Sequence, residues 1–76
     1  MPTVVEFGSV QIRLYAKDHL PPHFHISTPD GEAIVLLSDL RVVKGRIRRR
    51  DLELCRRWAM GNREILENEW NRLNRE

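Results

Sequence analysis

The chain has 76 residues, 41% of them hydrophobic and 32% charged, with a formal net charge of +2. This size predicts a single domain over residues 1–76, near the lower limit for a self-sufficient core, so a metal or a partner chain, including a second copy in a homodimer, would add stability. The absence of a long apolar run and of a signal-peptide pattern excludes a membrane protein, and the single cysteine, Cys55, excludes an internal disulfide; a cytoplasmic location is expected.

The first half of the chain, residues 1–45, has the patterns of β-strands. Residues 3–7 are rich in β-branched side chains and precede a Gly-Ser pair, and residues 10–17 alternate strictly between apolar and polar. The short connection predicts an antiparallel pair of strands. The core face of the second strand would carry Val10, Ile12 and Leu14, and its other face Gln11, Arg13, Tyr15 and Lys17.

Three further strands are expected before residue 45. Residues 23–28 alternate again, so that Phe24 and Ile26 face the core while His23 and His25 share the opposite face. Residues 33–37 are apolar at every position, which predicts a strand covered on both faces. Residues 40–44 are compatible with a fifth strand.

From about Arg48 the hydrophobic period becomes that of a helix. Gly61 would permit a bend, although the apolar stripe keeps its phase across it. The stripe contains Leu52, Cys55, Ala59, Asn62, Leu66, Glu69 or Trp70, and Leu73, and Trp58 and Ile65 widen it. The prediction is an α+β fold, with a small antiparallel sheet of four to five strands in residues 1–45 and one long or kinked C-terminal helix in residues 46–76 packed on one face.

All three histidines lie in one segment, residues 18–25, whose sequence is Asp-His-Leu-Pro-Pro-His-Phe-His. Histidine titrates near neutrality and is the commonest metal ligand, and the two prolines stiffen the segment. His23 and His25, at i and i+2 of a strand, would project from one face and suit two ligands of one divalent metal ion, with His19 as the third. Asp18 could instead serve as a metal ligand itself, or it could orient an imidazole through a hydrogen bond.

A second hypothesis needs no metal. If the second and third strands pair, Arg13, Tyr15 and Lys17 share a face with His23 and His25. Histidines beside cationic groups can perform general acid–base catalysis on a phosphodiester, as in a metal-independent ribonuclease with His19, His23 and His25 at its centre. In the third alternative the histidines are structural and Phe24 anchors the segment in the core. The residues leave open whether the protein is an enzyme.

Basic charge is concentrated in residues 41–57, which carry eight basic and two acidic groups. Arg46, Arg48, Arg49 and Arg50 would lie at the start of the helix, where the helix dipole favours acidic side chains. Phosphate contact would offset this unfavourable placement, so these four arginines are candidate nucleic-acid ligands. Arg56 and Arg57 would continue the basic surface. The alternative is that the arginines pair with acidic groups of the same chain.

Several of these motifs resemble the bacterial domain-of-unknown-function family 4160. The resemblance is carried by Met1-Pro2-Thr3, by Ile12-Arg13-Leu14-Tyr15, by the segment Asp18–His25 and by Trp58-Ala59, and it covers nearly the whole chain. It implies a small bacterial protein often encoded beside another small protein, with similar proteins catalogued as candidate toxins of toxin–antitoxin pairs.

The functional expectation is therefore one half of a two-gene module that binds or cleaves RNA. The alternatives are a non-catalytic domain that binds a cognate small protein, and a metal-binding domain. The arginine run is richer than the family leads one to expect.

Overall fold

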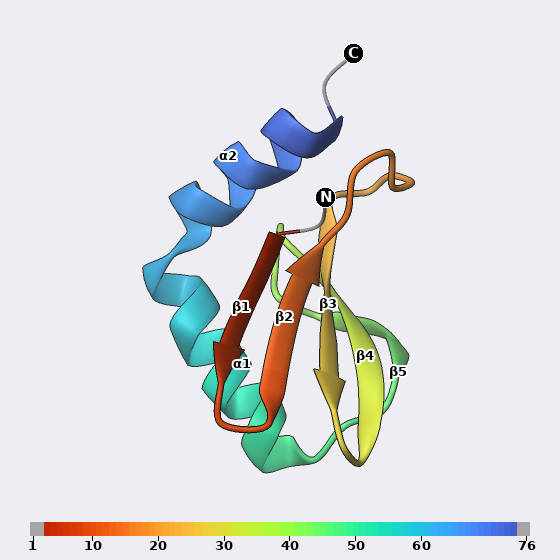
Figure 1. Cartoon of the computed structure of the whole chain (residues 1–76), viewed down its shortest axis with the longest axis vertical. Coiled ribbons are helices and arrows are strands. Elements are labelled where there is room, and N and C mark those ends of the chain that lie inside the picture. Colours follow the sequence, from red (N-terminus) through yellow and green to blue (C-terminus); the bar gives the residue numbers. More distant parts are fainter. Residues whose placement is uncertain (1–2, 75–76) are drawn as a thin grey trace.

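The computed structural model describes residues 3–74 of the chain, so Met1 and Pro2 of the family-like opening lie outside the described residues. Five strands precede two helices: β1 (Thr3–Phe7), β2 (Val10–Leu14), β3 (His23–Thr28), β4 (Gly31–Leu36), β5 (Val42–Gly45), α1 (Arg49–Gly61) and α2 (Arg63–Asn74). The strands form one antiparallel sheet in the order of the sequence, and both helices lie on one side of it (Figure 1). The predicted α+β fold is confirmed.

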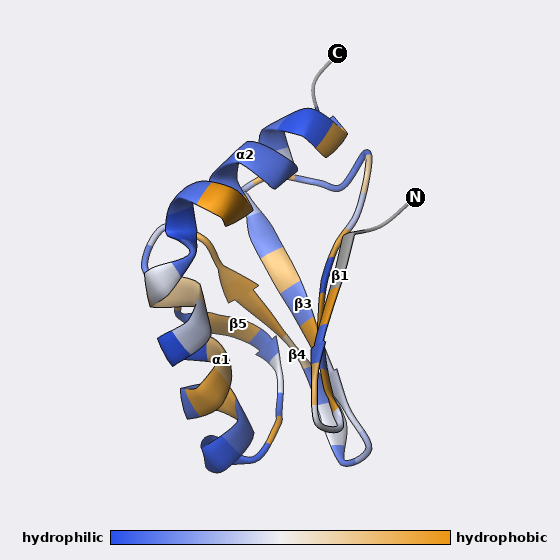
Figure 2. Cartoon of the chain, turned by 60° about the vertical axis from the view of Figure 1, so that its left-hand side comes forward, coloured by the Kyte–Doolittle hydropathy of each residue, from blue (hydrophilic) through white to orange (hydrophobic). Residues whose placement is uncertain are grey.

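The core lies between the sheet and the helices and contains buried apolar residues of both layers. Figure 2, in which the ribbon is coloured by hydropathy, shows hydrophobic stretches in the strands and in the helices. Strand alternation decides which residues enter it, because successive side chains point to opposite faces. Phe24 and Ile26 are fully buried, as predicted. The rest of the buried cluster is Val10, Ile12, Leu14, Val35, Leu37, Leu40, Cys55, Ala59, Leu66 and Trp70. Burial, with a smaller effect from Asp51, raises the pKa of the Cys55 thiol to about 11, so Cys55 acts as a small apolar core residue.

The helical half is divided in two at Asn62, directly after Gly61. The Asn62 backbone N–H donates to Ala59 O and its side-chain amide donates to Trp58 O, which closes α1. The predicted stripe continues through the break, because Cys55 and Ala59 of α1 and Leu66 and Trp70 of α2 are all buried. No helix in the described part of the chain is long and apolar enough to cross a membrane.

Three details of the predicted pattern were wrong. The second strand ends at Leu14 and not at residue 17, because the chain turns there and Lys17 has a positive φ of 57°. β4 is covered on one face only, so that Ile34 and Leu36 are half-buried while Ala33 and Val35 are buried. Ile65, which was expected to widen the apolar stripe, is exposed.

Two helix arginines hold the connection between β4 and β5. Arg56 Nε donates a 3.0 Å hydrogen bond to Leu40 O, and the Arg63 guanidinium donates to the carbonyl oxygens of Leu37 and Ser38. Arg56 is half-buried and therefore belongs to the packing of this loop, which corrects the expectation that it extends a basic surface.

Candidate metal centre

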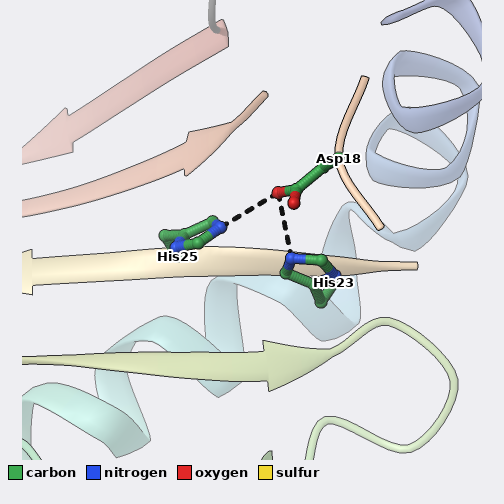
Figure 3. A group of neighbouring side chains, drawn as sticks. All are labelled: Asp18, His23 and His25. Atoms are coloured by element: carbon green, nitrogen blue, oxygen red, sulfur yellow. Dashed lines mark hydrogen bonds and ion pairs between the residues drawn. The ribbon is translucent and has the colours of Figure 1, made fainter. Parts of the chain in front are cut away.

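The histidine segment, residues 18–25, forms the second part of the loop that connects β2 to β3 and the first residues of β3, and it lies beside α2. His23 and His25 project from the same face of β3, and the Asp18 carboxylate reaches down between them from the loop (Figure 3). His23 Nε2 and His25 Nε2 lie 3.0 and 3.1 Å from the same oxygen, Asp18 Oδ2. One ligand atom from each of the three residues lies within 4.8 Å of the other two, which makes the group a candidate cation site.

His23 is the most buried member of the cluster, with 1% of its surface exposed. Its ring packs against Trp70 of α2 at a centroid separation of 5.2 Å and stacks with His19 at 4.8 Å. His23 Nδ1 lies 2.7 Å from Pro21 O. Since a carbonyl oxygen can only accept, Nδ1 carries the proton, and a neutral His23 has its lone pair on Nε2.

That second nitrogen, His23 Nε2, is buried and makes no hydrogen bond within the described residues. Asp18 Oδ2 is 3.0 Å away, but it lies off the direction in which the nitrogen would donate or accept a hydrogen bond. A buried lone pair beside a carboxylate is unfavourable unless a cation lies near both groups. The cation can be a second proton on His23 or a metal ion.

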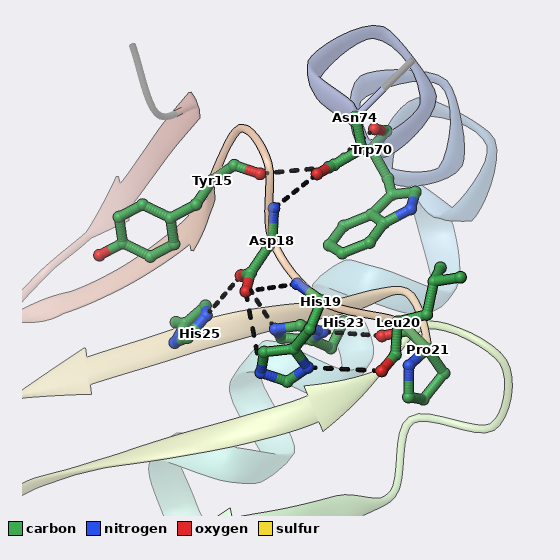
Figure 4. A network of polar contacts seen from close by, with 9 residues as sticks. All are labelled: Tyr15, Asp18, His19, Leu20, Pro21, His23, His25, Trp70 and Asn74. Atoms are coloured by element: carbon green, nitrogen blue, oxygen red, sulfur yellow. Dashed lines mark hydrogen bonds and ion pairs between the residues drawn. The ribbon is translucent and has the colours of Figure 1, made fainter. Parts of the chain in front are cut away.

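The position of Asp18 is set by the last turn of α2 (Figure 4). The Asp18 backbone N–H donates to Asn74 Oδ1 at 2.7 Å, and Asn74 Nδ2 donates to Tyr15 O at 3.1 Å. One side chain of α2 therefore holds both ends of the turn that follows β2. The Asp18 carboxylate also accepts a 2.9 Å hydrogen bond from the His19 backbone N–H, which fixes its rotation.

The surroundings of Asp18 favour its ionised form. Burial is the largest single influence and raises the pKa. The hydrogen bond from His25, the one from the His19 N–H and the electrostatic effects of His23 and His25 act in the opposite direction. Together they hold the pKa of Asp18 below its ordinary value of 3.8. The carboxylate is therefore charged at neutral pH, as a metal ligand must be.

This lowered pKa predicts a pH-dependent contribution to folding. A carboxyl whose pKa is lower in the folded state stabilises the fold above its unfolded pKa and loses that effect as the pH falls through the folded value. The stability difference between the wild type and Asp18→Asn should therefore be constant above about pH 5 and shrink below pH 4. Urea denaturation of both proteins from pH 2 to 7 measures it. The control is Glu67→Gln on α2, and a difference for Asp18→Asn that does not change with pH would contradict the prediction.

His25 connects the cluster to the open face of the sheet, and 30% of its side chain is exposed. Tyr15 stands perpendicular to it at a centroid separation of 4.8 Å, and Arg13 is its direct partner in the register of β2 and β3. A shallow groove of about 440 Å³ begins here and continues across the sheet, with His25, Ile34 and Lys44 among its lining residues.

The remaining residues of the predicted histidine site are more peripheral. His19 is 75% exposed, and its Nε2 lies 3.8 Å from Asp18 Oδ1, the oxygen that His23 and His25 do not contact. His19 thus covers the cluster from the solvent side, while Asp18 takes the third position beside His23 and His25. Lys17 is exposed in the turn after β2 and is not part of the strand face that carries Arg13.

The arginine run lies at the other end of the molecule. The histidine segment is near one end of the 35 Å long axis, and the connection from β5 to α1 is near the opposite end (Figure 1). The four side chains, Arg46, Arg48, Arg49 and Arg50, are exposed, and Arg48 pairs with Asp30 at 3.2 Å. The structure therefore separates the predicted phosphate contacts from the histidine site.

Two residues that build the site were not expected to belong to it. Trp70 fits the apolar stripe and was predicted only as a core residue, and nothing in the local sequence marks Asn74. Both meet the segment Asp18–His25 through tertiary contacts some 50 residues away in sequence. The only sequence signal is that Trp70 and Asn74 lie four residues apart, on one face of the helix.

These features define a small α+β protein with two histidines and one carboxylate gathered at the end of the central strand of its sheet. The chain belongs to the family described as Domain of unknown function (DUF4160), whose model matches residues 10–71. The resemblance noted in the sequence is thereby confirmed, and the match includes Asp18, His23 and His25. No curated protein and no solved structure matches the chain.

Proposed function

We propose that this protein is a metal-binding domain in which Asp18, His23 and His25 hold one divalent transition-metal ion. The observation that carries the proposal is His23 Nε2, a buried nitrogen that makes no hydrogen bond with the part of the chain described and lies beside a charged carboxylate. Its partner nitrogen donates to Pro21 O, which is the second-sphere hydrogen bond that metal-bound histidines usually make. The residue is thus held in the tautomer that a metal ligand requires.

The donor set suits Zn²⁺ or Fe²⁺ better than Ca²⁺ or Mg²⁺. Two imidazoles and one carboxylate are a recurring ligand group for zinc and non-haem iron, whereas calcium and magnesium prefer oxygen ligands. Ligand atoms on a tetrahedral zinc ion lie about 3.3 Å apart. The separations of 3.0 and 3.1 Å between the two imidazole nitrogens and Asp18 Oδ2 are close to this spacing.

Three protein ligands leave a coordination position for water, which a zinc ion would activate as a nucleophile. Access to that position is expected from the side of His25, because His23 is enclosed by Trp70 and the loop while His25 borders the open groove. This geometry supports a hydrolytic metal site as the catalytic form of the proposal.

The hydrogen bond of 3.1 Å between His25 Nε2 and Asp18 Oδ2 favours a second candidate function. A carboxylate that orients an exposed imidazole, with Tyr15 and Arg13 beside it, can serve in metal-free acid–base catalysis. The two candidates differ in their response to a chelator, which abolishes metal-dependent chemistry and leaves the acid–base pair unchanged.

Zinc titration of the purified apoprotein tests the proposal. We expect one Zn²⁺ per chain, with binding that weakens as the pH falls, because the ion displaces the proton on His25. Loss of a ligand in Asp18→Asn or His25→Ala should lower the affinity by more than about 100-fold. His19→Gln is the matched control, since it removes an exposed imidazole from the same segment, and it should change the affinity by less than about threefold. Metal-replete protein that retains no stoichiometric zinc after dialysis would contradict the proposal.

Three finer expectations from the sequence remain predictions. A cytoplasmic location follows from the composition, and a cognate small protein from a neighbouring gene and a role in a toxin–antitoxin module follow from the family resemblance. A metal-binding domain is compatible with each of them, and the contacts of Asp18, His23 and His25 favour none over another.

A further inference from the structure

A row of side chains crosses the helix-free face of the sheet through four adjacent strands. Arg13 pairs with His25, His25 with Ile34, and Ile34 with Lys44 in the antiparallel registers. Directly paired residues project from the same face, so these four side chains form one line with His25 near its middle. The same residues line the groove, together with Tyr15, Ser27 and Glu32.

The two cations of the row are available for an external anion. The Arg13 guanidinium donates to Gln11 Oε1, which is a neutral acceptor. Within residues 3–74, neither Arg13 nor Lys44 forms an ion pair with a carboxylate. Because they are separated by three strand spacings, they lie roughly 14 Å apart. This span is too wide for one phosphate and suits two phosphates of a single strand that are separated by a third.

The groove also offers a surface for a nucleobase. Tyr15 is half-buried at its rim, and its ring plane is at 89° to that of His25. Aromatic side chains on an open antiparallel sheet stack on unpaired bases, while basic side chains beside them contact the sugar–phosphate backbone. A shallow, open groove admits a strand that lies across it.

We propose that this face binds single-stranded nucleic acid, with the backbone running across the row Arg13–His25–Ile34–Lys44 and a base against Tyr15. A phosphodiester would then lie beside His25, at the open side of the candidate metal centre; this placement, though not the binding itself, rests on the proposed function. The exposed run Arg46–Arg50, which follows Lys44 in the chain, adds long-range attraction for a polyanion.

Among the described residues that line the groove, Glu32 is the one acidic side chain, and it is exposed. Its carboxylate opposes the binding of a phosphate, whereas its structural contact is made by its backbone carbonyl, which accepts from the Arg46 N–H. Neutralising the side chain should therefore strengthen nucleic-acid binding without loosening the fold.

Fluorescence anisotropy with a labelled 10-nucleotide single-stranded RNA tests the proposal, with the full chain in EDTA and again with zinc. Arg13→Gln and Lys44→Gln should each weaken binding at least fivefold and reduce the slope of log affinity against log salt by about 0.7. Tyr15→Ala should weaken binding at least fivefold, and Glu32→Gln should strengthen it at least twofold. Arg57→Gln, which removes an equal charge from the helix layer, is the control and should change affinity less than twofold.

The EDTA arm separates this inference from the metal proposal. RNA binding in EDTA that depends on Arg13, Lys44 and Tyr15 supports it, whether or not the protein binds zinc. No binding at low salt, or equal losses for Arg57→Gln and the face variants, would overturn it. Equal affinity for duplex RNA or for polyglutamate would overturn it as well, since the row and Tyr15 then confer no preference for an unpaired strand.

Discussion

Replacement of His23 by phenylalanine should abolish zinc binding while the fold of the apoprotein remains intact. Phenylalanine keeps a ring against Trp70 but removes both nitrogens, so the affinity should fall by more than about 100-fold through loss of a ligand. The fold should lose less than about 1.5 kcal/mol, because the ring volume is nearly retained and the bond to Pro21 O contributes only about 1 kcal/mol. Zinc titration and urea denaturation of the same preparation measure both effects.

The matched variant His23→Ala separates ligation from packing. It removes the same nitrogens and also leaves a cavity beside Trp70, so the free energy of unfolding should fall by about 2–4 kcal/mol. A His23→Phe protein that still binds zinc normally would exclude His23 as a ligand. If instead both variants destabilise the apoprotein equally, the nitrogens of His23 serve the fold and the site is structural.

Replacement of Phe24, which lies between His23 and His25 in β3, by alanine should lower the free energy of unfolding more than any other single alanine substitution in the chain. The Phe24 side chain is fully buried, and Phe24→Ala should cost about 3–5 kcal/mol through lost apolar burial and the cavity that remains. Domains of this size have a total stability of roughly 4–11 kcal/mol, so this single loss should remove about a quarter or more of it. Circular dichroism during urea and thermal denaturation measures the change.

Ile34→Ala is the control for Phe24→Ala, because Ile34 lies half-buried on the open face of β4. It should cost less than about 1.5 kcal/mol, since part of its surface is already in water. Similar losses for Phe24→Ala and Ile34→Ala would mean that the face opposite the helices is covered in solution, as the apolar sequence of this strand suggested.

The fold was predictable where one periodicity dominated the local sequence. Strict alternation in residues 23–28 places Phe24 and Ile26 in the core, and a helical period after residue 48 describes the buried stripe across the break at Asn62. The pattern failed at β4, because an uninterrupted apolar run does not show whether a second layer exists. Within residues 3–74 the helices form one layer on one face of the sheet, and Ile34 on the other face lines a groove.

The composition of the site depends on geometry that the sequence pattern does not contain. His19 and Asp18 are neighbours, and only the course of the loop, held by Asn74, directs the aspartate toward His23 and the histidine toward solvent. The distance between the arginine run and the histidines, in contrast, follows from the directions of the strands. β3 and β5 run in the same direction, so the residues after β5 must lie a full strand length from the start of β3.

The two hydrogen bonds of the Asn74 side chain, one donated to Tyr15 O and one accepted from the Asp18 N–H, couple α2 to the cluster of Asp18, His23 and His25. Because one side chain holds both groups, docking of α2 and assembly of the cluster are linked equilibria. Any ion that favours the assembled cluster must favour the docked helix by the same free energy. During synthesis Asp18, His23 and His25 emerge long before Trp70 and Asn74, so the contacts of this cluster with α2 can form only after the helix has been made.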